Sequence, residues 1–85
     1  MRYAVVFTNT AQRDLSRLQS SIVDRMEPII LSLEETPRPQ GVKKLQGSKD
    51  YYRIRIGDYR IIYQINDAEN HVVIARILHR REAYR

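Results

Sequence analysis

The stretch YYRIRIGDYRIIY, residues 51–63, decides the fold of this chain because it has the composition of a β-hairpin. Isoleucine and tyrosine favour strands, and a Gly-Asp step between two such runs is typical of a two-residue hairpin turn. With Gly57 and Asp58 as the turn, Arg55 lies opposite Arg60 and the other pairs follow in register. Like charges directly opposite each other destabilise a strand pair, so this register implies a compensating anion or carboxylate.

The two faces of the hairpin differ in chemistry, because side chains alternate between the faces of a strand. One face carries the apolar and aromatic residues Tyr52, Ile54, Ile56, Tyr59, Ile61 and Tyr63. The opposite face carries Arg53, Arg55, Arg60 and Ile62. Arginine binds phosphate oxygens through paired N–H donors, so the second face is predicted to be a phosphate site. The alternative is an arginine face exposed only to solvent.

A strand at 2–8 and two helices are predicted before the hairpin. Apolar residues recur at helical spacing in both helices. They are Ala11, Leu15 and Leu18 in the first, and Ile22, Met26, Ile29, Ile30 and Leu33 in the second. Residues 9–10 offer caps for the first helix, and Ser21 with Asp24 resembles a capping box for the second. Pro28 lies inside the second stripe, where the missing N–H predicts a kink.

The remaining segments complete a single domain over residues 1–85. ETPRPQG (35–41) ends the second helix, and VKKLQGSKD (42–50) is interpreted as a basic connector anchored by Leu45. Strands are predicted at 51–56, 59–65 and 71–78. The order β-α-α-β-β-β predicts an α+β fold, a small antiparallel-rich sheet with the two N-terminal helices packed on one face.

The formal net charge of +5 is concentrated in the second part of the chain. Residues 38–85 hold 11 Lys and Arg against 5 Asp and Glu, whereas residues 1–37 hold 4 against 5. This asymmetry favours a polyanion or an acidic protein as partner. The lack of cysteine excludes disulfides and a thiol nucleophile, and no segment is long and apolar enough to span a membrane. We expect a cytoplasmic protein.

The last stretch, VVIARILHRREAYR at 72–85, adds further candidates for a site: Arg76, His79, Arg80, Arg81 and Tyr84. Metal-free RNA cleavage needs a group that takes the proton of the 2′-hydroxyl, cations that stabilise charge on phosphorus, and a group that protonates the leaving oxygen. The cations that fit are Arg53, Arg55, Arg60 and Arg80. His79 and Tyr84 fit the proton transfers.

Peripheral contacts to RNA phosphates are predicted for Lys43, Lys44, Lys49, Arg76 and Arg81. Glycine-rich phosphate loops, paired metal-binding carboxylates and the HExxH pattern are absent from the sequence. Neither a metal nor another cofactor is therefore predicted.

The chain resembles the RelE/ParE toxin superfamily in four stretches that follow in the same order: TNTAQRDLSRL (8–18), PRPQGVKKLQG (37–47), YYRIRIGDYRIIYQI (51–65) and ARILHRREAY (75–84). The match is greater to the RelE branch. It implies a ribosome-dependent endoribonuclease that cuts mRNA and is held inactive by a cognate antitoxin wrapping around it.

The resemblance also implies site roles for Arg53, Arg55, Arg60, Arg80 and Tyr84. Relatives can have lysine at the strand positions, whereas this chain has Arg53 and Arg55, and arginine does not release a proton in proteins. His79 stands where relatives have another basic residue, so it is the predicted proton carrier.

Two other functions fit the same sequence. A ParE-like protein of this fold would inhibit DNA gyrase by binding, without catalysis. A small basic module, or an inactive toxin, would bind RNA in a salt-dependent way without cleaving it. The predicted partners are an antitoxin with an acidic, partly disordered segment, the ribosome and mRNA. Alone, the chain is expected to be a monomer, and with antitoxin a hetero-oligomer.

Overall fold

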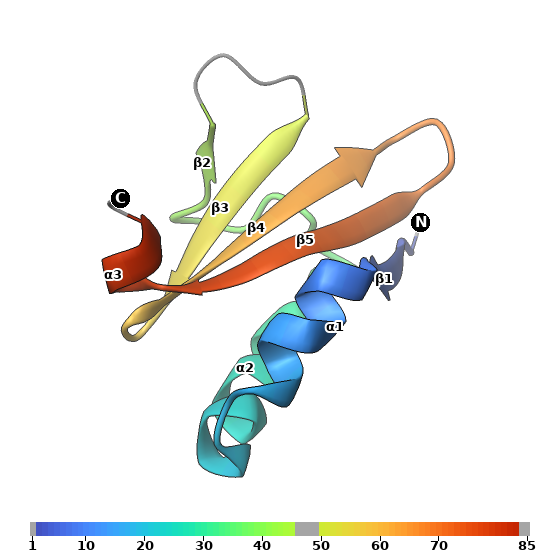
Figure 1. Ribbon diagram of the computed structural model, residues 1–85. Helices are drawn as coiled ribbons and strands as arrows, with labels where there is room; N and C mark the ends of the chain where they lie inside the picture. The colour runs from blue at the N-terminus through green and yellow to red at the C-terminus, as the bar shows by residue number, and fades with distance from the viewer. Residues whose placement is uncertain (1, 46–49, 84–85) are drawn as a thin grey trace.

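The computed structural model describes residues 2–45 and 50–83 and shows an α+β fold (Figure 1). Its elements are β1 (Ala4–Phe7), α1 (Asn9–Ser16), α2 (Ser20–Ser32), β2 (Lys43–Lys44), β3 (Tyr51–Ile56), β4 (Tyr59–Asn66), β5 (His71–His79) and α3 (Arg80–Ala83). The strands form one sheet in the order β1-β5-β4-β3-β2. β1 runs parallel to β5, and all other neighbours are antiparallel. The predicted fold class is confirmed.

The hairpin register follows the prediction, with Arg55 opposite Arg60 and Ile54 opposite Ile61. Of the two turn residues, Gly57 alone has a positive φ, 58°. Glycine adopts this left-handed conformation without the clash that a Cβ would cause, and a hairpin turn with glycine at its first central position needs it there. The turn therefore fixes which side chains share a face.

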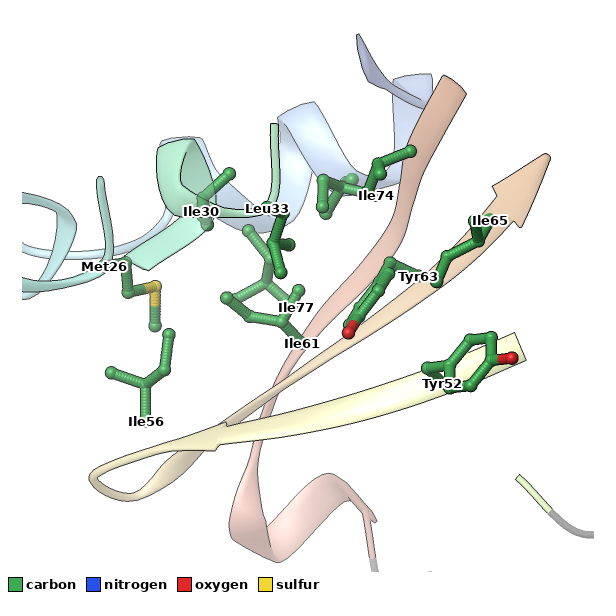
Figure 2. Close-up of a cluster of buried hydrophobic side chains, with 12 residues drawn as sticks. Met26, Ile30, Leu33, Tyr52, Ile56, Ile61, Tyr63, Ile65, Ile74 and Ile77 are labelled. Atoms are coloured by element: carbon green, nitrogen blue, oxygen red, sulfur yellow. The ribbon is translucent and has the colours of Figure 1, made fainter. Parts of the chain in front are cut away.

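The core lies between one face of the sheet and the helices α1 and α2 (Figure 2). Its buried members are Ala11, Met26, Ile30, Leu33, Tyr52, Ile56, Ile61, Tyr63, Ile65, Val72, Ile74 and Ile77. The Tyr63 hydroxyl donates to the carbonyl of Pro37 at 2.8 Å, so the buried phenol is satisfied. Burial raises the pKa of Tyr63. Figure 2 also shows α3 on the side of the sheet away from α1 and α2.

Both predicted helix starts were wrong. The cap of α1 is Thr8, whose Oγ1 accepts from the Ala11 N–H at 3.0 Å and donates to the Ala75 carbonyl at 3.0 Å. This hydroxyl joins the helix start to β5, which residues 9–10 cannot do from inside the helix. The N-cap of α2 is Gln19, with no side-chain cap hydrogen bond. The helix runs from Ser20 to Ser32 through Pro28.

The connector contains a short strand that the sequence did not predict. Lys43 pairs with Arg53 and Lys44 with Tyr52, which makes β2 the edge of the sheet. Among the described connector residues, Val42 and Leu45, the predicted anchor, are both half-buried, and Val42 packs against the core. β1 is shorter than predicted, β4 and β5 are each one residue longer, and α3 is new. Within the described residues, no helix is long and apolar enough to cross a bilayer.

Candidate functional site: an arginine-lined cleft

A small cleft of about 80 Å³ lies on the sheet face opposite the helices. Its lining residues are Gly41, Lys43, Arg53, Arg55 and Arg60. Strand pairing brings them together, because Lys43 pairs with Arg53 and Arg55 with Arg60. The predicted arginine face therefore exists, and β2 adds a lysine to it.

The three arginines of the cleft differ in exposure. Arg60 is only 7% exposed, Arg53 is half-buried, and Arg55 is exposed with its Nε 3.4 Å from the Gly57 carbonyl. Gly41 has a φ of 90°, so the chain turns there through the left-handed region before Lys43 enters the sheet. The cleft thus has a buried cation in its floor and exposed cations at its rim.

The charge of the cleft is of one sign. Among the described residues that line it, four are cationic and none is acidic. Cations held this close repel one another, and a bound anion offsets that repulsion. Guanidinium groups pair with phosphate oxygens in a bidentate manner, so a phosphodiester has the shape and charge that this lining would bind.

Arg76 lies outside the cleft, at the edge of β5. β1 pairs with β5 from His71 to Ile74. Beyond Ile74, Asp14 of α1 covers the edge of β5. The Asp14 carboxylate accepts from Arg76 Nε at 2.9 Å and from the Ile77 N–H at 2.9 Å. Burial raises the pKa of Asp14, but the hydrogen bonds from Arg76 and Ile77 outweigh it, so the pKa lies below its usual value.

His79 lies on the face of the sheet opposite to the cleft arginines. The sequence had grouped it with them as a candidate for the same site. It pairs with Tyr59, and the two rings meet edge to face with centroids 5.1 Å apart. With Tyr59 it lines a separate cavity beside Ile22 and Met26 of α2. The reason is an irregularity between β4 and β5: Tyr63 pairs with Ile74 but Ile62 with Arg76, so Ala75 is an extra residue.

The other predicted site residues that the structure describes are not in the lining of the cleft. Arg80 opens α3, donating its N–H to the Asp58 carbonyl at 2.7 Å, with its guanidinium 3.9 Å from the Asp58 carboxylate. Arg81 follows it and is exposed. Lys44 pairs with Tyr52, so the pleat directs it away from Lys43. Tyr84 and Lys49 lie outside the described residues.

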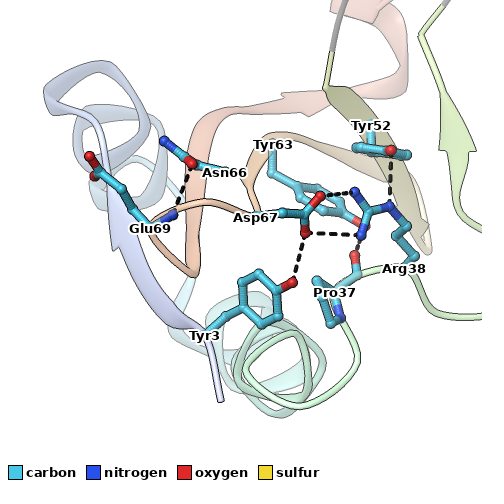
Figure 3. Close-up of polar contacts among 8 residues, drawn as sticks. All are labelled: Tyr3, Pro37, Arg38, Tyr52, Tyr63, Asn66, Asp67 and Glu69. Carbon is cyan, nitrogen blue, oxygen red and sulfur yellow. Dashed lines mark hydrogen bonds and ion pairs between the residues drawn. The ribbon is translucent and has the colours of Figure 1, made fainter. Parts of the chain in front are cut away.

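A polar cluster around Arg38 was missed by sequence reasoning (Figure 3). Arg38 donates to both Asp67 oxygens, at 3.3 and 2.8 Å, and to the Tyr52 hydroxyl at 3.0 Å. The Tyr3 hydroxyl donates to Asp67 at 2.7 Å. The hydrogen bond from Arg38 and, to a smaller extent, that from Tyr3 lower the pKa of Asp67. The hydrogen bond that Tyr3 donates to Asp67 raises the pKa of Tyr3. The cluster ties the connector to the β4–β5 turn, just before the connector reaches the cleft.

The cluster forms because Arg38, in the PRP stretch at 37–39, pairs with Asp67, which is distant in the sequence. No local sequence pattern predicts such a pairing. Among the described residues, no group of three or more His, Asp or Glu side chains is placed to hold a metal ion.

The sequence and the fold of this chain are similar to those of known proteins. A family model described as the ParE toxin of the type II toxin-antitoxin system parDE matches residues 5–84. Toxin RelG of Mycobacterium tuberculosis is 35% identical, covering 100% of this chain and 99% of its own. The mRNA interferase toxin RelE of Escherichia coli is 30% identical, covering 96% and 86%. The RelE-RelB complex from the archaeon Pyrococcus horikoshii has a TM-score of 0.83 at 32% identity, covering 94% and 97%. The chain therefore belongs to the RelE/ParE superfamily, the toxins of type II toxin–antitoxin systems.

Proposed function

We propose that this toxin is an endoribonuclease that cleaves mRNA on the ribosome, using the RNA 2′-hydroxyl as nucleophile and no metal ion. The observation that carries the proposal is the cleft, where four cations from β2, β3 and β4 surround a space with no acidic residue in its described lining. The printed name of the Escherichia coli relative, mRNA interferase, supports it.

The cleft cations would act on the phosphate that is cleaved. When the 2′-hydroxyl oxygen attacks phosphorus, negative charge accumulates on the two non-bridging oxygens. Cations that are already fixed in place stabilise the charge of the transition state more than the charge of the ground state. This difference is usually the largest contribution to catalysis. Arg60 would bind from the floor, with Arg53 and Arg55 from the rim.

The proton transfers need groups other than the cleft arginines. Arginine holds its proton throughout the working pH range, so the cleft arginines serve as electrostatic groups. Tyr84 is the remaining candidate for proton transfer, and the family resemblance gives it a role in the site. Arg80, at the start of α3, would add positive charge near the cleft. His79 is left out of the reacting groups because it faces the other side of the sheet.

A cognate antitoxin is proposed as the regulatory partner. The solved relative from Pyrococcus horikoshii is a complex of RelE with RelB, which supports a hetero-oligomer for this toxin as well. A segment rich in Asp and Glu would complement the cleft and neutralise its cations. Such a segment would then compete directly with RNA.

The chemistry is tested with an mRNA on programmed ribosomes that carries a single 2′-deoxy nucleotide at the mapped cleavage position. The all-ribose mRNA should yield a 2′,3′-cyclic or 3′-phosphate end, and the 2′-deoxy mRNA should stay intact at that position. Cleavage of both substrates at equal rates would overturn 2′-hydroxyl attack.

A second function, inhibition of DNA gyrase, is favoured by the ParE description of the matching family model. It predicts loss of DNA supercoiling by purified gyrase in the presence of the toxin, together with intact mRNA on programmed ribosomes. The two assays, run on one preparation of the protein, separate the two functions.

A further inference from the structure

His79 occupies the junction between the sheet and the C-terminal helix. It is the last residue of β5, and α3 begins at the next residue, Arg80. Its ring rests edge to face on Tyr59, with an interplanar angle of 89°. The imidazole is therefore held by the sheet at the point where the chain changes from strand to helix.

The imidazole makes a hydrogen bond that is typical of a helix cap. The N–H of Arg81 donates to His79 Nδ1 at 3.2 Å. With Arg80 as the first helical residue, Arg81 is the second, and an N-cap side chain accepts from the N–H of the second or third residue. Nδ1 thus occupies the place that an Asn or Asp oxygen takes in an ordinary cap.

This cap works only while Nδ1 has no proton, since a protonated imidazole is a donor at both nitrogens. Histidine is the side chain whose ordinary titration falls between about pH 5 and 8. Among the side chains that the structure describes, the charged groups around His79 are Arg25 of α2 and Asp58 of the β3–β4 turn, which line its cavity of about 200 Å³, and Arg80 and Arg81 of α3. Tyr59 is the titratable neighbour on β4.

Protonation would therefore remove a hydrogen bond and add a cation near three arginines. Asp58 opposes the repulsion only in part, because its carboxylate also lies 3.9 Å from Arg80. The bond from the Arg80 N–H to the Asp58 carbonyl involves the main chain alone and is unaffected by the charge. The first turn of α3 would then be held by one contact fewer.

We propose that His79 is a positioning residue, whose neutral imidazole caps α3 and whose protonation releases the first turn of that helix, with Arg81, from the sheet. The consequence for activity rests on the proposed function, in which Arg80 adds charge near the cleft. The cap itself does not depend on that function. This assignment replaces the role of proton carrier that the sequence suggested for His79.

The cap is tested by NMR on the purified toxin, following the Arg81 amide and the His79 ring from pH 8 to pH 5. In the native protein the Arg81 amide should shift and lose protection from hydrogen exchange as the ring titrates. In His79→Asn, whose side-chain oxygen caps without titrating, the amide should stay protected throughout. His71→Asn, which removes the other histidine, should behave as the native protein does. An Arg81 amide that is unaffected while the His79 ring titrates would overturn the proposal.

Cleavage on programmed ribosomes over the same pH range tests the consequence. His79→Ala should be slower at pH 8, because losing a cap typically shifts the helix equilibrium by about fivefold toward the uncapped state. His79→Asn should keep its rate as the pH falls, while the native rate declines. Loss of cleavage by His79→Asn at every pH would show a proton carrier and overturn the positioning role. If the native toxin cleaves no RNA, the proposed function fails, and the NMR measurement still decides the cap.

Discussion

Two groups of arginines in this molecule lie in different surroundings. Arg38 and Arg76 each reach a carboxylate, Asp67 at 2.8 Å and Asp14 at 2.9 Å, and each of these pairs joins segments far apart in the chain. Arg53, Arg55 and Arg60 are instead gathered by strand pairing into one cleft whose described lining contains no acid. The first group joins distant segments through ion pairs, and the second concentrates positive charge at one place on the sheet.

The largest effect is expected from Arg53→Ala. Removing a fixed cation from a site where charge develops slows a reaction on the order of 10² to 10³-fold. The free energy of unfolding should stay the same or rise slightly, because Arg53 lies opposite Lys43 and like charges across strands repel. Cleavage rates on programmed ribosomes and urea unfolding check the two parts. A variant that loses stability and keeps its cleavage rate would remove the distinction between the two groups.

Asp14→Ala should show the reverse behaviour. The substitution leaves the buried N–H of Ile77 without its acceptor and Arg76 without its carboxylate, so unfolding should become easier by about 2 kcal/mol. Asp24→Ala, which removes an exposed carboxylate from α2, is the control and should have little effect. Urea unfolding at pH 7 measures both. Equal stability of the two variants would show that the Asp14–Arg76 pair does not support the fold.

Stability should also depend on Asp14 at low pH. Its pKa is lowered in the folded chain, so the unfolded chain takes up a proton first as the pH falls. The stabilisation is therefore complete above the unfolded pKa, about 3.9, and is lost as the pH falls through the folded value. Asp14→Asn should flatten this dependence in urea unfolding between pH 5 and pH 2. An unchanged slope in the variant would assign the dependence to other carboxylates, such as Asp67.

The smallest effect is expected from Lys43→Arg, which tests whether the lysine of the cleft acts in the same way as the arginines. The variant keeps the positive charge but cannot release a proton. Because Lys43 is assigned an electrostatic role, Lys43→Arg should cleave mRNA at nearly the native rate while Lys43→Ala is slower. If both variants are equally slow, Lys43 transfers a proton and differs in kind from the cleft arginines.

The sequence predicted the arginine face because a two-residue turn leaves only one register. Once Gly57 and Asp58 form the turn, the pleat determines that Arg53, Arg55 and Arg60 share a face. The lysine that completes the cleft was predicted only as a peripheral contact. Two residues of a basic connector show no strand pattern, and Lys43–Lys44 pair with β3 through tertiary structure alone.

The placement of His79 on the face away from the arginines has one structural cause. The extra residue Ala75 shifts the pairing of β5 with β4, so His79 rather than Leu78 lies opposite Tyr59. A bulge of this kind has no clear sequence signal, and it changes the face of every later residue. Contacts such as Arg76 with Asp14, which join α1 to β5, depend on packing that appears only when the elements are assembled.

The most direct test of the central claim compares mRNA cleavage by Arg55→Ala and Arg13→Ala on the same programmed ribosomes. Each substitution removes one exposed arginine and changes the net charge equally, but Arg55 lines the cleft and Arg13 lies on α1. We expect Arg55→Ala to be slower on the order of 10²-fold and Arg13→Ala to cleave at the native rate. Equal cleavage rates for the two variants would contradict the assignment of the cleft as the site.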